Sequence, residues 1–154
     1  MAQFTRSAVL AWTGDVLRGT GTVTAGSDAF GIAASFPRLA GEPEGTTTPE
    51  ELLAASHATC FGIGLRSVIA QRGGTATRVH ATATVTAEKG REGIRIRGAH
   101  LEGMVEGLAG LEADALEEIG RAAEEGCTIS ILLRPSIPIT VAVRTADVPV
   151  PSVD

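Results

Sequence analysis

The chain has 154 residues, of which 44% are hydrophobic and 20% charged, so it is predicted to form one globular domain and is not a disordered chain. Its net charge of −5 and its 3% of aromatic residues argue against nucleic-acid binding, which needs a basic surface or stacking rings. No apolar run approaches the roughly 20 residues that span a bilayer, and no signal peptide is evident. We therefore expect a cytoplasmic protein with no membrane contact.

The first third of the chain predicts three strands separated by turns. Alternation of apolar and polar residues, with Gly and Asp between the runs, indicates strands at residues 7–12, 19–25 and 30–36. Residues 37–48 are polar and contain Gly and Pro throughout, which is typical of a loop.

A long helix is predicted next. Thr48 can cap it, Pro49 suits its first position, and the two glutamates that follow lie at the positive end of the helix dipole. The pattern continues to about residue 71 and ends at a pair of glycines. Because the segment is rich in small and apolar residues on nearly all sides, we expect a central, buried helix.

The remainder of the chain predicts strands and shorter helices, which makes the fold class α+β, with antiparallel sheets wrapped around the long helix and a second helix. We expect a single domain over residues 1–154. The predicted elements are strands at 79–87 and 94–106 joined by a turn at 89–93, a helix at 111–125, one helical turn at 129–133, a strand at 137–143 and a loose tail at 146–154.

The chain has two cysteines, Cys60 in the long helix and Cys127 after the second helix. In a reducing compartment such a pair favours catalysis or metal binding over a structural disulfide. A thiolate at Cys60 would need a cation to hold it. Arg18, in a loop before a Gly-rich strand, is a candidate if Glu50 orients it toward Cys60. A buried free cysteine is also often only a small apolar residue, and a loop arginine is often only solvated.

Three segments carry a resemblance to a known family. They are WxGDxxRGxG at residues 12–21, TPEELLAAxHAxCF at 48–61 and AxxGC at 123–127. In this order and spacing the chain resembles the OsmC/Ohr family, the osmotically inducible protein C and organic hydroperoxide resistance proteins, and its OsmC branch in particular. The resemblance runs from about residue 8 to residue 144.

The resemblance implies a thiol peroxidase that reduces organic hydroperoxides to alcohols. It places the attacking cysteine at Cys60, the resolving cysteine at Cys127, and the arginine and glutamate of the site at Arg18 and Glu50. It further implies an intertwined homodimer, a lipoyl dithiol carried on a protein partner as reductant, and neither cofactor nor metal. Arg18 would stabilise the thiolate and polarise the peroxide, and Glu50 would fix the guanidinium. Thr128 stands where the family usually has proline, and Thr48 where asparagine is common.

Apolar residues surround both cysteines, which predicts a preference for bulky organic hydroperoxides over hydrogen peroxide. A loop with two further apolar residues would cover the mouth of the pocket. The residues are Phe61, Ile63, Leu65, Ile129, Ile131 and Leu132, with Phe36 and Leu39 in the loop.

Two other functions stay open. One is a binding or stress protein of the same fold with inert thiols. The other is a metal-binding module built on His57, Cys60 and Cys127, although a closed zinc site needs four ligands. His57 is expected to pack or to form a hydrogen bond, and His80 and His100 to be ordinary strand residues.

Overall fold

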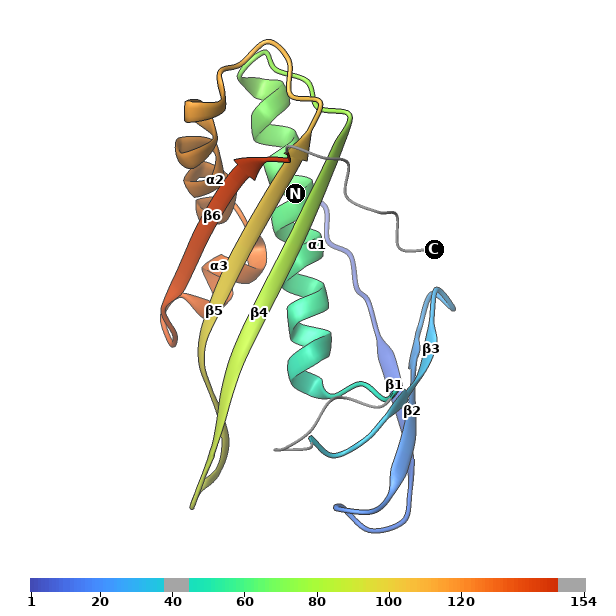
Figure 1. Cartoon of the computed structure of the whole chain (residues 1–154). Coiled ribbons are helices and arrows are strands. Elements are labelled where there is room, and N and C mark those ends of the chain that lie inside the picture. Colours follow the sequence, from blue (N-terminus) through green and yellow to red (C-terminus); the bar gives the residue numbers. More distant parts are fainter. Residues whose placement is uncertain (38–44, 147–154) are drawn as a thin grey trace. The chain divides into compact units, whose positions relative to one another are not determined.

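The computed structural model describes residues 1–37 and 45–146, and the chain divides into two compact units, Met1–Leu52 and Leu53–Asp154 (Figure 1). Each unit has its own three-stranded sheet. Leu39 and residues 147–154 of the predicted tail lie outside the described residues.

The first unit contains an antiparallel sheet of three consecutive strands. Its order is β1 (Ala8–Thr13), β2 (Thr20–Ala25) and β3 (Gly31–Ala34). Trp12 pairs with Gly21 on β2, and a side chain at Gly21 would collide with the Trp12 ring and the Ala11 carbonyl. The three predicted strands are confirmed, although the third ends two residues earlier than expected.

The long helix, α1 (Pro49–Gln71), has the predicted ends. At its start the Glu51 amide donates to Oγ1 of Thr48 at 3.4 Å. At its end Gly73 has a φ of +83°, which favours glycine, and the Gly74 amide donates to the carbonyl of Ile69 at 3.0 Å.

The expectation that α1 is buried on nearly all sides is wrong for the chain alone. Only His57, Phe61, Leu65 and Ile69 are buried, and they form a single stripe at four-residue intervals. Ile63, on another side of the helix, is 69% exposed. An amphipathic pattern is absent from the sequence, so periodicity could not reveal which side faces the sheet.

The second unit contains a sheet in the order β4 (Arg78–Gly90), β5 (Gly93–Glu106) and β6 (Ile139–Thr145). The predicted β4–β5 hairpin is confirmed as an antiparallel pair. β6 instead runs parallel to β5, because the helices between them return the chain in the same direction. It also starts later than predicted, at Ile139, directly after Pro138, which has no amide hydrogen to donate.

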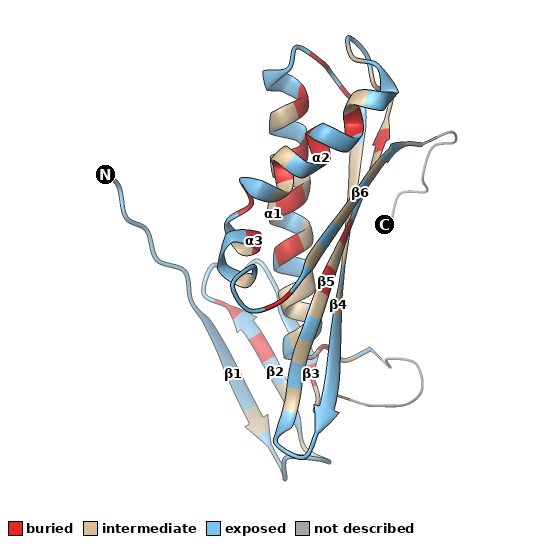
Figure 2. Ribbon diagram, turned by 90° about the vertical axis from the view of Figure 1, so that its left-hand side faces the viewer, coloured by how far each residue is buried: buried red, intermediate tan, exposed pale blue. Residues whose placement is uncertain are grey.

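Helices on the sheet form the core of this unit (Figure 2). The predicted second helix consists of a 3₁₀ turn at Ala113–Ala115 and α2 (Leu116–Glu125), and the predicted helical turn is α3 (Thr128–Leu133). Two glycines permit close approach: a Cβ at Gly103 would lie 2.6 Å from Leu65 of α1, and one at Gly120 would lie 2.5 Å from Val143 of β6. The core side chains are Phe61, Leu65, Ile69, Ala76, Leu101, Val105, Leu116, Ile119, Ala123 and Cys127.

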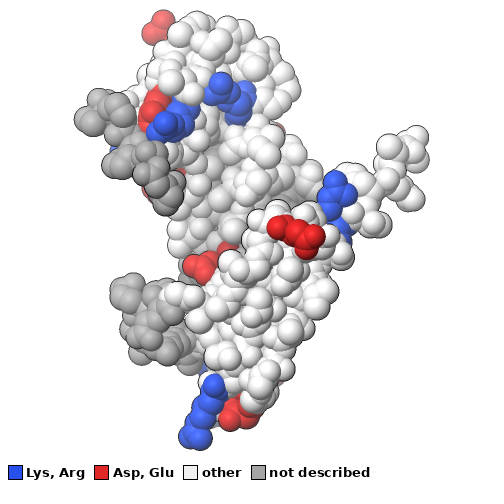
Figure 3. Space-filling view, turned by 90° about the vertical axis from the view of Figure 1, so that its right-hand side faces the viewer, with Lys and Arg blue, Asp and Glu red and all other residues white. Residues whose placement is uncertain are grey.

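Figure 3 shows one face of the molecule, on which uncharged groups prevail and the charged side chains stand in small separate groups of both signs. That face offers no continuous basic surface, as the acidic composition predicts.

Candidate active site

The two thiols, 67 residues apart in sequence, lie together in the second unit. Cys60 is half-buried on α1, and Cys127 is buried in the extended link between α2 and α3. Both are free thiols, and their side chains form a hydrogen bond with each other. The fold therefore brings the two cysteines of the chain into contact.

Cys60 has the environment of a reactive thiol. Burial acts to raise its pKa, but hydrogen bonds outweigh burial and hold the pKa below the ordinary thiol value. The donors are the amide of Ile129, the thiol of Cys127, and both the amide and the hydroxyl of Thr128. Proline at position 128 would supply neither of the two Thr128 donors, so the departure from the usual family residue adds support for the thiolate.

Cys127 has the opposite character. Burial raises its pKa, and its hydrogen bond to Cys60 raises the pKa further because the bond needs the thiol proton. The amide and hydroxyl of Ser130 act in the lowering direction but do not offset burial. The pair is thus polarised, with the pKa of Cys60 below and that of Cys127 above the ordinary thiol value.

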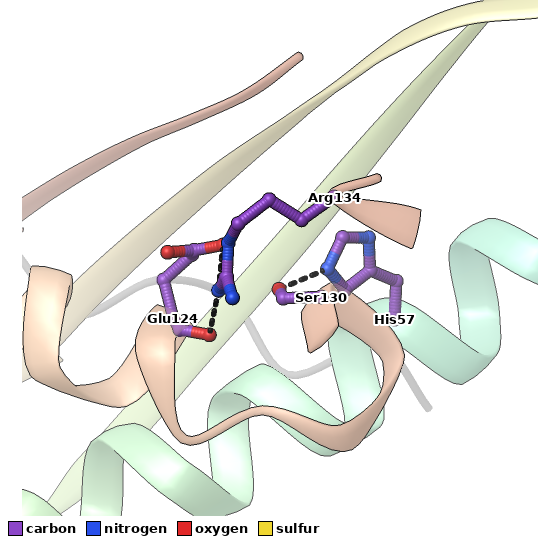
Figure 4. Close-up of polar contacts among 4 residues, drawn as sticks. All are labelled: His57, Glu124, Ser130 and Arg134. Atoms are coloured by element: carbon purple, nitrogen blue, oxygen red, sulfur yellow. Dashed lines mark hydrogen bonds and ion pairs between the residues drawn. The ribbon is translucent and has the colours of Figure 1, made fainter. Parts of the chain in front are cut away.

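A buried histidine lies one helical turn before Cys60. Nε2 of His57 and Oγ of Ser130 are 2.8 Å apart, and both residues are fully buried (Figure 4). Nδ1 of the ring is buried and has no hydrogen-bond partner among the described residues. Burial lowers the pKa of His57 more than the nearby Glu124 carboxylate raises it, so the ring is neutral at neutral pH. His57 is the hydrogen-bonding residue that was expected.

An ion pair lies beside this histidine. Arg134 donates to Oε1 of Glu124 at 2.9 Å, and the carboxylate is 13% exposed (Figure 4). This pair joins the segment after α3 to the end of α2, on either side of Cys127 in the sequence.

Arg18 lies in an exposed turn of the first unit. The Asp15 carboxylate accepts hydrogen bonds from the amides of Leu17 and Arg18, each at 2.9 Å, and the Asp15 carbonyl accepts one from Gly19 at 2.8 Å. These bonds fix the backbone that carries the guanidinium.

Glu50 lies in the first turn of α1. Its Oε2 is buried and has no hydrogen-bond partner, from Arg18 or any other group, within residues 1–37 and 45–146. Burying a carboxylate oxygen without a hydrogen-bond donor costs desolvation free energy. A cationic partner would offset that cost.

The metal-site alternative lacks its ligands in the described ranges 1–37 and 45–146. No group of three or more His, Cys, Asp or Glu side chains there could hold a metal ion. Nε2 of His57, which such a site could use, is already bonded to Ser130.

The chain is similar in sequence to proteins of one known family. The family model described as "OsmC-like protein" matches residues 41–142. The Escherichia coli protein "Peroxiredoxin OsmC" is 34% identical over 131 residues, which cover 82% of this chain and 87% of that protein. The chain belongs to the OsmC-like family.

Solved structures agree with this membership. A Legionella pneumophila protein described as an organic hydroperoxide resistance protein OsmC has a TM-score of 0.73 and 26% identity, over 94% of this chain and 99% of that one. The organic hydroperoxide resistance protein OhrB of Bacillus subtilis, at 24% identity and a TM-score of 0.70 over 93% and 100%, shares the fold. The predicted α+β fold and family are confirmed.

By length and hydropathy alone, α1 would also pass as a membrane span, with 23 residues and a mean hydropathy of 1.4. The core helix of a folded domain meets the same criterion, and the buried stripe of α1 belongs to such a core. Family membership therefore favours a core helix over a membrane span.

Sequence reasoning missed the residues that surround the two thiols. Ser130, the Thr128 hydroxyl and the Glu124–Arg134 pair received no role. One signal was available: Ser130 follows Cys127 by three residues, just as Cys60 follows His57 by three. The positions of the apolar residues were only partly anticipated, because Phe61 and Leu65 are core residues with no exposed surface, whereas Ile131 and Leu132 are exposed.

Proposed function

We propose that this protein is a thiol peroxidase that reduces organic hydroperoxides to alcohols. The Cys60 thiolate attacks the peroxide, the O–O bond breaks, and the leaving alkoxide takes a proton to become the alcohol, which leaves Cys60 as a sulfenic acid. The Cys127 thiol then condenses with the sulfenic acid to give a disulfide and water. An external dithiol returns both cysteines to thiols and is itself oxidised to a disulfide.

One observation carries this proposal: the two thiols share a hydrogen bond, and their surroundings move their pKa values in opposite directions. A nucleophile needs a thiolate in reach of the substrate, which suits the half-buried Cys60. A resolving thiol needs protection from the peroxide and closeness to the sulfenic acid, which suits the buried Cys127. The names of the similar proteins, a peroxiredoxin and hydroperoxide resistance proteins, agree with this chemistry.

We assign Arg18 and Glu50 to the same reaction, as the family resemblance implies. Arg18 carries a guanidinium, a cationic group with several hydrogen-bond donors, which can stabilise a thiolate and polarise a peroxide oxygen. Glu50 supplies a buried carboxylate oxygen that still lacks a partner, and a guanidinium would satisfy it. No cofactor or metal is required.

We propose that the protein acts as a homodimer. An open groove of about 600 Å³ runs between α1 and β4, and its lining combines small and apolar residues, including the exposed Ile63, with two arginines and two threonines. A helix of this hydropathy with one buried stripe leaves apolar surface that a second copy can cover. The groove is lined by Ala58, Thr59, Gly62, Ile63, Arg66, Thr77, Arg78, Val79 and Ala81.

We also propose a substrate class, a reductant, a cellular location and a domain organisation. Exposed apolar side chains next to the cysteines, Ile63 on α1 with Ile131 and Leu132 on α3, favour a substrate with an alkyl or aryl group. We propose a lipoylated protein as reductant, a cytoplasmic location and a single domain over the chain.

Cysteine variants test the proposed roles. Cys60→Ser should abolish consumption of cumene hydroperoxide, because serine is not ionised at neutral pH. Cys127→Ser should allow one turnover and then accumulate a sulfenic acid that dimedone traps. Rapid mixing with one equivalent of peroxide, followed by mass spectrometry, measures both. If Cys127→Ser blocks the first turnover while Cys60→Ser permits it, the roles are reversed.

A further inference from the structure

We propose that His57 and Ser130 are positioning residues, and that their buried hydrogen bond clamps α3 to α1 so that Cys127 is held beside Cys60. This His57–Ser130 clamp rests on the proposed function only in that it assigns the resolving step to Cys127. The placement of the two sulfurs relative to each other does not depend on which oxidant they meet.

The spacing of the four residues is the first support. His57 precedes Cys60 by three residues on α1, and Ser130 follows Cys127 by three residues at the start of α3. Residues three apart on a helix lie on the same side, one turn apart. The 2.8 Å bond between His57 and Ser130 and the contact between the two sulfurs are therefore neighbouring links between the same two segments.

The weakness of α3 on its own is the second support. α3 has six residues, too few for an isolated helix to be stable, so its position depends on tertiary contacts. Two of its apolar side chains contribute little to such contacts, since Ile131 is 53% exposed and Leu132 is 70% exposed. The hydrogen bond from His57 fixes α3 at Ser130, which is fully buried.

The cost of a histidine at this position is the third support. Its Nδ1 is buried and has no hydrogen-bond partner among the described residues, and burying such an atom costs the free energy of its lost hydration. Leucine would fill a core position without that cost, so packing alone does not account for a histidine. What the ring supplies beyond packing is a directional bond to Ser130.

The clamp acts with a neutral ring. The charged groups near His57 are Glu124 at the end of α2 and Arg134 after α3, and these two form an ion pair with each other (Figure 4). Burial keeps the ring neutral. In the tautomer with hydrogen on Nε2, the ring donates to Ser130 and Nδ1 carries a lone pair. A lone pair is less costly to bury without a partner than an N–H group.

The test is the thiol–disulfide equilibrium of the chain with glutathione, measured without peroxide. Two electrons and two protons pass from Cys60 and Cys127 to glutathione disulfide, which gives the protein disulfide and two glutathione thiols. The equilibrium constant reports how well the two sulfurs are held together. The variants are the double substitution His57→Leu/Ser130→Ala, the single substitution Ser130→Ala, and His57→Gln, whose side-chain amide can still donate to Ser130.

We expect the double variant to lower the equilibrium constant at least tenfold while its thermal stability stays close to that of the unmodified chain, because both polar partners are removed together. His57→Gln should recover most of the loss. His80→Gln, a half-buried histidine of β4, serves as a control and should leave the constant unchanged.

An unchanged constant in the double variant overturns the clamp. If the double variant does not fold, Ser130→Ala, which removes a single oxygen, decides in its place, and an unchanged constant there overturns the clamp as well. A loss in His57→Gln equal to that in the double variant also overturns it, because the ring's shape and not its bond would then matter. A chain that equilibrates with glutathione as expected but consumes no peroxide would refute the proposed function and leave the clamp standing.

Discussion

At the scale of single residues, two chemically identical thiols differ only through their surroundings. Cys60 is half-buried and accepts hydrogen bonds from the segment that begins α3, whereas Cys127 is buried and donates. The same contact lowers one pKa and raises the other, because one proton is shared between two sulfurs. The assignment of nucleophile and resolving thiol therefore rests on environment.

The first prediction at this scale is a pH profile. The pKa of Cys60 is lowered, so its rate of alkylation by iodoacetamide should rise with pH and have its midpoint below that of an ordinary thiol. Cys127→Ala removes one donor and should move the midpoint upward. Cys127→Ser is the matched control, because its hydroxyl can still donate. A midpoint in the unmodified chain equal to or above that of a cysteine in an unstructured peptide, measured under the same conditions, would contradict the account.

Sequence could predict part of this site. Cys60 and Cys127 stood out as the only thiols, and the family motifs marked Arg18 and Glu50. For Ser130 the sequence offered only its spacing of three residues from Cys127, which matches that of His57 and Cys60, because a serine within a short apolar helical turn has no chemistry of its own. Its role depends on His57, 73 positions earlier, and a contact across that distance is set by packing that no local pattern encodes.

At the scale of elements, local sequence signals predicted where α1 begins and ends but not which of its sides is buried. A capping threonine, a proline at the first position and a glycine at the end are local signals, and all three act as expected. Which side of α1 is buried, and the parallel direction of β6, are tertiary facts. They depend on how the chain returns through α2 and α3, which the spacing of strands does not reveal.

The contact between α1 and β5 gives a stability prediction. A Cβ at Gly103 would lie 2.6 Å from a methyl carbon of Leu65 and 3.1 Å from one of Val143, so Gly103→Ala should overpack the core and destabilise the fold by about 1–3 kcal/mol.

Gly64→Ala on α1 is the matched control for this substitution. Its nearest neighbour would be the Ala123 carbonyl at 3.5 Å, an ordinary contact, and alanine in a helix is favoured over glycine by about 0.5–1 kcal/mol. Urea unfolding measures both variants. A Gly103→Ala variant as stable as Gly64→Ala would show that Leu65 moves aside without cost.

At the scale of the whole molecule, the exposed part of α1 and the buried Glu50 oxygen both support association with a second copy of the chain. In the described part of one chain, α1 leaves apolar surface exposed and the buried Glu50 oxygen has no donor, and a second copy can satisfy both.

We therefore predict a dimer in solution. Light scattering at micromolar concentration should give twice the chain mass of 15.7 kDa. Ile63→Glu places a charge in the exposed groove along α1 and should shift the protein toward the monomer, whereas Val16→Glu, at an exposed position of the first unit, should not. A monomeric mass for the unmodified chain would count against the dimer.

Substrate preference is also a property of the assembled site. Burying an alkyl chain contributes about 0.8 kcal/mol per CH₂, so four or five carbons favour an organic hydroperoxide over hydrogen peroxide by about two orders of magnitude or more. Steady-state assays with a lipoyl dithiol as reductant compare the two substrates. Similar kcat/KM values for a fatty-acid hydroperoxide and for hydrogen peroxide would refute the apolar pocket.

The central claim is that Cys60 and Cys127 together reduce one organic hydroperoxide per cycle. Its most direct test is to count thiols with a chromogenic reagent before and after one equivalent of cumene hydroperoxide, with the alcohol measured in the same sample. The account predicts that two thiols disappear for each alcohol formed and that a dithiol restores both. Thiols that survive the peroxide unchanged would contradict it and would indicate a protein of this fold with inert cysteines.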